Sequence, residues 1–147
     1  DVASMCKLGF DLGLKELSTD ELAYCQTAVT NWKRLQAAIM DGVQYRLVSP
    51  YQSNHMAVNY VSRDTDKAVL FAYDIYPRFQ EKLMPVRLQG LNPDKRYKVE
   101  EINLMPSVKS ALKANGKIYS GDYLMKVGLD VFGTAITQSH VIELTAQ

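Results

Sequence analysis

The stretch Ala68-Val69-Leu70-Phe71-Ala72-Tyr73 decides the fold class of this 147-residue chain. It is a nearly continuous apolar run, and the turn-rich segment 63–67 precedes it. An apolar run of this length is typical of a strand that is buried on both faces of a sheet. The sequence therefore predicts a β core with this strand near its centre.

Shorter strand candidates lie on both sides of the central run and are separated by turn signals such as Gly90-Leu91-Asn92-Pro93-Asp94. The candidates are residues 45–48, 56–61, 85–88, 97–102, 122–127 and 140–144. About seven short strands with turns between them predict an antiparallel β-sandwich. Residues 106–119 leave two alternatives, because 108–112 suit one helical turn whereas Asn115-Gly116 suits a hairpin; we favour the hairpin.

Residues before 42 follow a helical pattern instead. Apolar residues recur there at spacings of three and four: Leu22, Cys25, Val29, Trp32, Leu35 and Ile39. Ser18 and Glu21 form a capping-box signature at the start of the helix. Gly42, after Asp41, predicts a left-handed stop. Residues 1–8 suit the end of an earlier helix that breaks at Gly9.

The charge balance and the apolar pattern exclude several classes of protein. Lys and Arg number 17 against 16 Asp and Glu, a net charge of +1, which argues against a dedicated nucleic-acid binder. No apolar run approaches the roughly 18 residues of a membrane span. The first residues lack the basic start and apolar core of a signal peptide, so we expect a soluble chain. Because Asp1 is not an initiator Met, we expect the gene product to start upstream.

No histidine or cysteine stands in a pattern that predicts chemistry. His55 and His140 have no second ligand at metal-binding spacing, and we expect a surface His55 and a strand-borne His140. Cys6 with His140 could form a nucleophile and base, but no local motif supports the pair. Cys25 lies on the apolar helix face, where a buried, inert thiol is expected. The sequence predicts no metal ligand and no cofactor.

Three carboxylate pairs are acid/base candidates: Asp64 with Asp66, Glu100 with Glu101, and Asp1 with Asp11. The first pair lies in a turn and is expected to cap it through side-chain bonds. The second lies in a strand, where neighbouring side chains point to opposite faces. Asp11 follows a loop and is also expected to cap. We therefore assign no catalytic residue.

The tyrosines Tyr45, Tyr51, Tyr60, Tyr73 and Tyr76 gather in the β region. Exposed rings in a row could stack on sugars, but a β core also favours Tyr and Phe, and we favour the core. Lys109, Lys113 and Lys117 suit a solvated face. Gly116 and Gly121 are isolated turn glycines, so no phosphate-binding loop is predicted.

Six segments occur in an order and spacing that are specific when taken together. They are residues 1–12, 17–22, 45–51, 69–73, 87–93 and 120–125. In this order they resemble the C-terminal end of glycoside hydrolase family 36, the α-galactosidases or melibiases, in a Bacteroides-like branch. The resemblance runs along nearly the whole chain.

The resemblance implies a parent protein with an N-terminal β-supersandwich, a central (β/α)8 barrel and a C-terminal antiparallel β domain. Residues 1–42 would be the last helical part of the barrel, and residues 43–147 the C-terminal domain. The implied reaction is retaining hydrolysis of terminal α-galactosides such as melibiose or raffinose by two aspartates. The family's Lys-Trp-Asp and Ser-Gly-Gly-Gly segments are absent here, so no catalytic residue carries over.

The expected role is therefore structural support of a barrel by a non-catalytic portion. The expected partner is the upstream barrel of the same parent chain, and the helix face of Leu22, Trp32 and Ile39 could also pair with a second copy. One alternative is a carbohydrate-binding module, which needs Tyr51, Tyr60 or Tyr76 exposed in a row on one sheet face. The other is a self-contained enzyme. The sequence indicates neither the substrate-binding residues nor the compartment.

Overall fold

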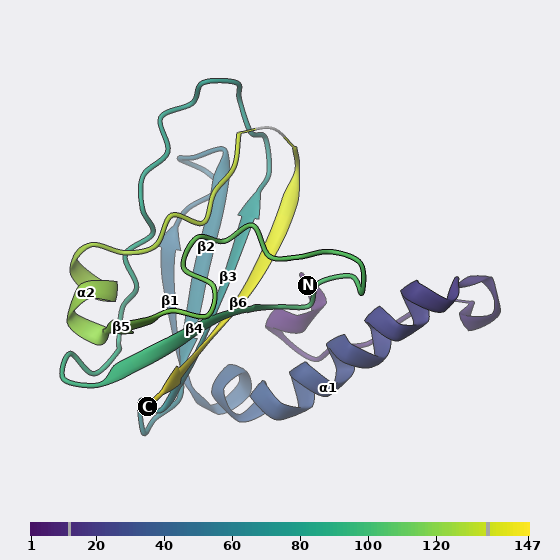
Figure 1. Ribbon diagram of the computed structural model, residues 1–147, viewed down its shortest axis with the longest axis horizontal. Coiled ribbons are helices and arrows are strands. Elements are labelled where there is room, and N and C mark those ends of the chain that lie inside the picture. Colours follow the sequence, from purple (N-terminus) through teal and green to yellow (C-terminus); the bar gives the residue numbers. More distant parts are fainter. Residues whose placement is uncertain (12, 135) are drawn as a thin grey trace.

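Six strands form one sheet (Figure 1). A long helix packs its C-terminal half against one face of this sheet, and its N-terminal half projects beyond the sheet. The structure, a computed structural model, describes residues 1–11, 13–134 and 136–147, so Leu12, which ends the first segment of the resemblance, lies outside it. The elements in chain order are η1 (Ala3–Met5), η2 (Leu14–Glu16), α1 (Thr19–Asp41), β1 (Val43–Val48), β2 (His55–Val61), β3 (Lys67–Asp74), β4 (Arg96–Ile102), β5 (Ile118–Ser120), α2 (Gly121–Lys126) and β6 (Gln138–Ala146).

The strand order is β1-β2-β3-β6-β4-β5, and every neighbouring pair is antiparallel. The last strand, β6, thus lies between β3 and β4, so the C-terminal end of the chain completes the middle of the sheet. The apolar run 68–73 forms β3 and is buried on both faces, as predicted. The mainly antiparallel β class with a preceding helix is therefore confirmed.

The sheet has a separate apolar core on each face. On one face, Leu70 and Ile142 lie with Leu88, Leu124 and Leu129 of an opposite layer. That layer consists of the segment 83–91, α2 and the segment 128–133, with a single β-bridge between Val86 and Leu129. On the other face, Val69, Phe71 and Val141 pack against α1.

Helix α1 begins as predicted. The Glu21 amide donates to Ser18 Oγ at 3.3 Å, and the Ser18 amide donates to Glu21 Oε2 at 2.8 Å, which completes the capping box. The end of the helix differs from the prediction. Gly42 has φ −79° and is extended, not left-handed. Glycine is needed at this position because of space: a Cβ on residue 42 would lie 2.2 Å from Ala38 O and 2.4 Å from Val61 O.

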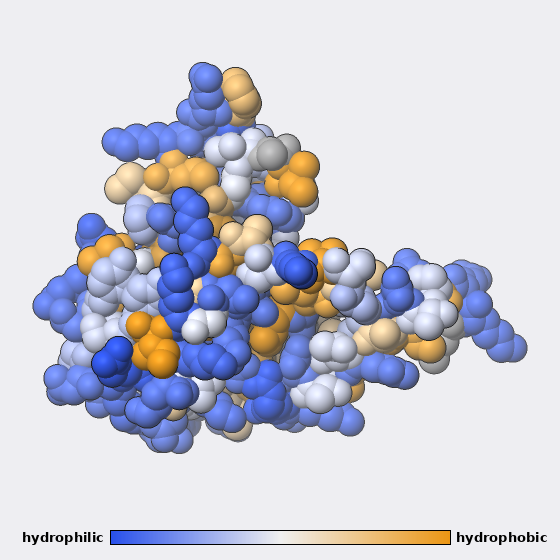
Figure 2. Space-filling view, viewed as in Figure 1, coloured by the Kyte–Doolittle hydropathy of each residue, from blue (hydrophilic) through white to orange (hydrophobic). Residues whose placement is uncertain are grey.

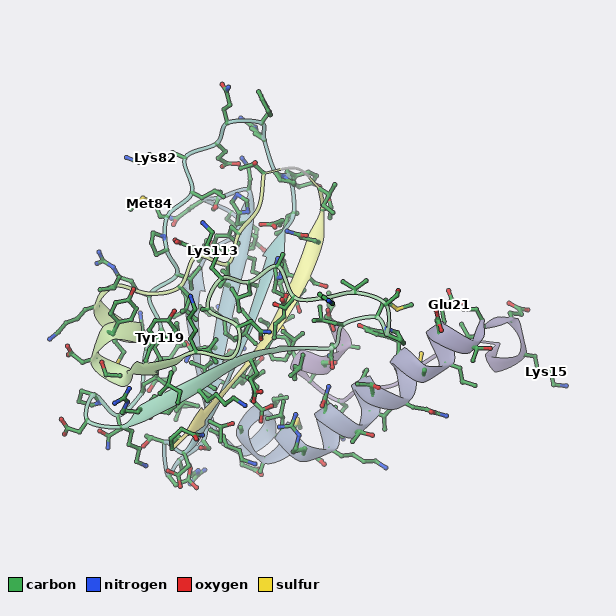
Figure 3. All side chains as sticks on the ribbon, in the orientation of Figure 1. Lys15, Glu21, Lys82, Met84, Lys113 and Tyr119 are labelled. Atoms are coloured by element: carbon green, nitrogen blue, oxygen red, sulfur yellow. The ribbon has the colours of Figure 1, made fainter. Side chains whose placement is uncertain are left out.

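The predicted apolar stripe of α1 is covered along only part of its length. Leu35 and Ile39 belong to the core, and Trp32 is half-buried with its Nε1 donating to the Cys6 carbonyl at 2.8 Å. Leu22, at the other end, is exposed. Figure 1 shows this N-terminal half leaving the sheet, and Figure 3 places Glu21 and Lys15 at its tip.

Four local predictions need correction or refinement. Residues 122–127 form the helix α2, not a strand, because Ser120 Oγ accepts from the Tyr123 amide at 3.1 Å and starts a helical turn. Residues 85–88 make only the bridge at Val86. Residues 106–119 contain no helix; the predicted Asn115–Gly116 turn leads into β5, which pairs with the distant β4. Within 1–8 there is a 3₁₀ turn, η1, in place of an α-helix.

Candidate functional site

Four titratable side chains meet at one end of the sheet, on the face opposite α1. They come from four different strands: His55 from β2, Asp74 from β3, His140 from β6 and Glu101 from β4. His55 and Asp74 are direct partners in the β2–β3 register, so their side chains point to the same face. A fifth group, Glu81, reaches them from the loop after β3. We call these five residues the charged network.

His55 lies at the centre of the charged network. Its Nδ1 is 2.7 Å from Asp74 Oδ1, and its Nε2 is 3.3 Å from Glu81 Oε2. The ring stacks on Phe132 with centroids 4.6 Å apart. The prediction of a surface His55 is therefore wrong, because only 3% of the residue is exposed.

Asp74 is fully buried, and each of its oxygens has a partner. Oδ1 contacts His55, while Oδ2 accepts from the Gly133 amide at 2.9 Å and from Gln138 Nε2 at 2.8 Å. A buried carboxyl group without partners would be strongly destabilising, so these contacts offset the cost of burying Asp74. They also fix the segment around Gly133 to the end of β3.

His140 and Glu101 form the second pair of the charged network. His140 Nδ1 is 2.6 Å from Glu101 Oε1, and the Ser110 hydroxyl donates to Glu101 Oε2. His140 Nε2 has no hydrogen-bond partner among the described residues and lies 3.9 Å from Asp74 Oδ2. The strand-borne His140 is as predicted. Its pairing with Glu101 fastens the loop 103–117, which carries Ser110, to the sheet.

The pKa values of the two glutamates fall for the same physical reason. Burial raises the pKa of Glu101, but hydrogen bonds from His140 and Ser110 outweigh it and hold the pKa below its usual range. Burial likewise raises the pKa of Glu81, and hydrogen bonds from Asn54 and the Arg78 amide, with the nearby His55, lower it overall. Both groups are therefore carboxylates at neutral pH.

The groups of the charged network bind one another, and nothing in their arrangement resembles a reaction centre. Among the described residues, no group of three or more His, Cys, Asp or Glu side chains is placed to hold a metal ion. No hydroxyl or thiol nucleophile is bonded to either imidazole in the hydrogen bonds of the described part of the chain. The arrangement is suited to holding loops on the sheet.

The predicted carboxylate pairs do not come together as acid/base pairs. Asp64 Oδ1 accepts from Ser62 Oγ at 2.5 Å and from the Asp66 amide at 3.0 Å, which confirms the predicted turn cap. Glu100 forms an ion pair with Lys98 at 2.7 Å, whereas Glu101 belongs to the charged network on the opposite face. Adjacent strand residues thus point to opposite faces, as predicted.

Asp1 is bonded to Tyr24, Asn103 and Ser139, with Oδ2 of Asp1 accepting from the Ser139 hydroxyl at 2.7 Å. These contacts hold the start of the chain against the sheet. Cys6 is exposed, and Cys25 is half-buried where a buried thiol was predicted. The partial exposure of Cys25 follows from its place on the projecting half of α1.

The tyrosines do not form a row on one sheet face. Tyr60 is buried on the α1 side and accepts a hydrogen bond from Gln44 Nε2 at 2.8 Å. Tyr51 and Tyr76 are exposed, but they lie in the loops that flank β2 and β3. The flat aromatic surface that a sugar-binding module would require is therefore missing at these positions.

Two open hollows flank the N-terminal segment on the α1 face of the sheet. One has a volume of about 490 Å³ and is lined by Met5, Met56, Tyr73 and Ile75, among others. The other is about 560 Å³ and includes Ile39, Met40 and Tyr60. Apolar side chains, orange in Figure 2, are also scattered among polar ones along the projecting helix. This face of the domain is thus incompletely covered by the chain itself.

Sequence reasoning missed Asp74 and Glu81. Asp74 directly follows the apolar run of β3. A carboxylate at the end of a buried strand indicates a buried charged group that needs polar partners. Glu81 gave no such signal, because it lies in an irregular loop. No helix in the described residues has the length and apolar character needed to cross a membrane.

Comparisons with known proteins match most of the chain. A family model described as the glycosyl hydrolase family 36 C-terminal domain matches residues 55–144. Alpha-galactosidase 1 of Pediococcus pentosaceus is 33% identical over 127 residues, which are 86% of this chain and 16% of that protein. Probable alpha-galactosidase C of Aspergillus flavus is 32% identical over 139 residues, 95% of this chain and 17% of that protein.

Solved structures agree in fold. The family 36 alpha-galactosidase AgaB from Geobacillus stearothermophilus superposes with a TM-score of 0.82 at 24% identity, over 99% of this chain and 18% of that one. A variant of AgaA from the same organism, solved in complex with raffinose, has a TM-score of 0.81 at 23% identity. The chain thus spans less than a fifth of the length of these proteins. The relatives are bacterial and fungal, and the Bacteroides-like branch stays a prediction.

Proposed function

The chain belongs to the glycosyl hydrolase family 36 C-terminal domain family, and on that premise we propose that it is the non-catalytic C-terminal portion of a longer α-galactosidase. In that protein it supports the catalytic barrel. The longer protein removes terminal α-galactosyl groups from substrates such as melibiose and raffinose by the retaining mechanism. The observation that carries the proposal is that this chain matches a C-terminal domain family, and that its relatives are proteins more than five times its length.

The projecting half of α1 supports this role. Leu22 is an exposed leucine on a helix whose other end is packed in the core. An exposed leucine on a projecting helix is a surface of the kind that a neighbouring domain covers, and the two open hollows near the N-terminal segment leave more of the same sheet face uncovered. We assign this surface to the contact with the upstream barrel, with residues 1–42 as the tail of the barrel and 43–147 as the C-terminal domain.

The alternative to the barrel is that a second copy of the chain covers the same surface. Ile39 is buried and Trp32 is half-buried, so a second copy would contact α1 mainly near Leu22. Sedimentation of the 147-residue chain at high concentration tests this pairing, and a monomer there would count against it. A sugar-binding module is not favoured, because Tyr60 is buried and the row of rings is absent from the sheet face.

The proposal is tested by comparing this chain with the longer protein encoded by the same reading frame. Nitrophenyl α-galactoside should be hydrolysed by the longer protein and left intact by the 147-residue chain. Hydrolysis by the 147-residue chain alone would overturn the proposal, and heat released on titrating it with galactosides would favour the sugar-binding alternative.

The contact through α1 is tested by Leu22→Lys in the longer protein, with Thr27→Lys as the matched control. Both residues are exposed on α1 and gain the same charge, but they lie on different sides of the helix. We expect Leu22→Lys to lower the melting temperature of the longer protein and Thr27→Lys to leave it nearly unchanged. Equal effects of the two substitutions would argue against a barrel contact at Leu22.

A further inference from the structure

The loop 75–85, between β3 and the bridge at Val86, is attached to the sheet at few points. Its root is held by the Ile75 and Tyr76 amides, which both donate to Asn54 O at 3.0 Å, and by the Ile75 carbonyl, which accepts from Thr137 Oγ1 at 3.4 Å. Beyond this root, the hydrogen bonds that join the loop to the rest of the described chain come from Glu81. Gln80, next to it, has φ 59°, a left-handed conformation that a side chain other than Gly adopts at a cost. Glu81 therefore anchors a strained loop.

Each ring nitrogen of His55 faces a carboxylate, Asp74 on one side and Glu81 on the other. Glu81 Oε1 accepts from Asn54 Nδ2 at 3.0 Å, and Oε2 accepts from the Arg78 amide at 3.3 Å. Both Glu81 oxygens accept these bonds, and the pKa of Glu81 lies below its usual range, so this group has no proton to donate at neutral pH. Asp74 Oδ2 likewise accepts from the Gly133 amide and from Gln138 Nε2. With a carboxylate facing each ring nitrogen, both contacts of His55 are hydrogen bonds only if both nitrogens carry a proton.

We propose that His55, Asp74 and Glu81 form a pH-sensitive clasp that holds the loop 75–85 closed while His55 is an imidazolium and releases it when His55 becomes neutral. The proton that leaves is the one on Nε2. Asp74 is fully buried and lies 2.7 Å from Nδ1, so it retains its hydrogen bond, whereas Glu81 lies 3.3 Å from Nε2 with 23% of its side chain exposed. Without that proton, the Nε2 lone pair faces a carboxylate oxygen, and the contact becomes repulsive.

The His140 pair provides an internal contrast. Its hydrogen bond to Glu101 uses Nδ1 alone, and a neutral imidazole with its proton on Nδ1 can form it. The other charged groups around His140 are Asp74, at 3.9 Å from Nε2, and Lys113 and Asp130, which line the same hollow as His140. The loop 103–117 should thus stay closed at a pH at which the loop 75–85 opens.

The clasp also has an acid limit. The hydrogen bonds to Glu81 hold its pKa below the usual range, so its contribution to stability is present above the unfolded value of about 4.3 and is lost as the pH falls through the lower folded value. The alkaline limit follows from the loss of the His55 proton. The loop is therefore held most firmly at mildly acidic pH.

Limited trypsin digestion of the 147-residue chain, read by mass spectrometry, tests the clasp. Arg78 and Lys82 are exposed sites in the loop 75–85, Lys109 is exposed in the loop 103–117, and Lys15 is an exposed reference at the far end of the chain. Figure 3 shows the Lys82 side chain pointing away from the sheet. Dividing the rates at Arg78 and Lys82 by the rate at Lys15 in the same sample removes the pH dependence of trypsin itself.

Between about pH 6 and about pH 8.5 we expect this ratio to rise by about tenfold, the factor that corresponds to one hydrogen bond to a charged group, while the Lys109 ratio stays constant. Glu81→Ala should give the high ratio at both pH values. Glu81→Gln should remove the rise, because an amide can donate to Nε2 of a neutral His55.

Ser110→Ala is the matched control. It removes the hydroxyl that donates to Glu101, so it should raise cleavage at Lys109 and leave the pH response at Arg78 and Lys82 intact. The proposal is overturned by a wild-type ratio that does not change with pH, by equal rises at both loops, or by a Glu81→Ala ratio equal to that of the wild type at about pH 6. The wild-type comparison decides the matter even if a variant does not fold.

Discussion

Leu22 and Leu35 belong to the same apolar stripe of α1, yet Leu35 is 2% exposed and Leu22 is 38% exposed. The C-terminal half of the helix, which holds Leu35 and Ile39, shares a core with Val69 and Phe71. The N-terminal half carries the same pattern and projects beyond the sheet (Figure 1). Periodicity thus predicts which side of a helix is apolar, but the partner that covers it depends on what the rest of the chain can reach.

The largest difference between the two halves should appear on truncating the two leucines. Leu35→Ala removes buried methyl groups and leaves a cavity, so the free energy of unfolding should fall by about 2–5 kcal/mol. Leu22→Ala removes the same atoms from a site that is already hydrated, and we expect less than about 0.5 kcal/mol. Urea denaturation followed by circular dichroism measures both values. Similar losses for the two variants would show that the halves are equally packed.

The sequence was most informative where one local pattern determines one local structure. The apolar run of β3 and the capping box at Ser18 both appear in the structure as predicted. The apolar pattern of residues 122–127 predicts a strand, but the segment is helical because the helix signal, the Ser120 cap, lies before it. A short apolar segment fits either structure, and its surroundings decide between them.

The charged network could not be predicted from the sequence, because it depends on strand register. His55 meets Asp74 only because β2 and β3 pair with His55 opposite Asp74, and a slip of one residue would place them on different faces. His140 comes from the C-terminal strand, which lies between β3 and β4. Glu81 joins them from an irregular loop. Contacts of this kind depend on the tertiary structure.

The junction between the packed half of α1 and the sheet should be the next most sensitive point. Gly42→Ala would place a Cβ 2.2 Å from Ala38 O and 2.4 Å from Val61 O, so the helix end or β1 would have to shift. Overpacking of this kind costs about 1–3 kcal/mol. Gly9→Ala is the matched control, because no atom of the described part of the chain lies within 4 Å of its added carbon. Thermal melts of both variants test the difference, and a wild-type melting temperature for Gly42→Ala would contradict it.

A smaller effect is expected from the polar link between α1 and β6. Arg34 Nη1 donates to Glu143, whose side chain is 7% exposed, but Arg34 itself is 40% exposed and is screened by solvent. We expect Arg34→Met to lower the free energy of unfolding by about 1 kcal/mol and the loss to shrink at high salt. Lys126→Met, which removes an exposed i,i+4 pair with Asp122, should cost less. A loss for Arg34→Met that does not depend on salt would indicate lost packing instead.

The smallest global effect should come from the cap of the projecting half. Ser18→Ala removes the acceptor for the Glu21 amide, a change that costs about 1 kcal/mol where the helix end is part of the cooperative unit. Because residues 19–22, the first turn of α1, are exposed, the cost should appear as local fraying, with less than about 0.5 kcal/mol on global unfolding. Hydrogen exchange measures this directly: amides near Tyr24 should exchange about fivefold faster in the variant, while those near Leu35 keep the wild-type rate. If both groups of amides exchange faster together, the helix unfolds as one piece with the sheet, and the projecting half is not free in this chain.

In the longer protein, where we propose that the barrel covers Leu22, the same substitution should lower the global free energy of unfolding by the full amount. The same substitution, measured in the two proteins, therefore reports whether the apolar stripe is covered.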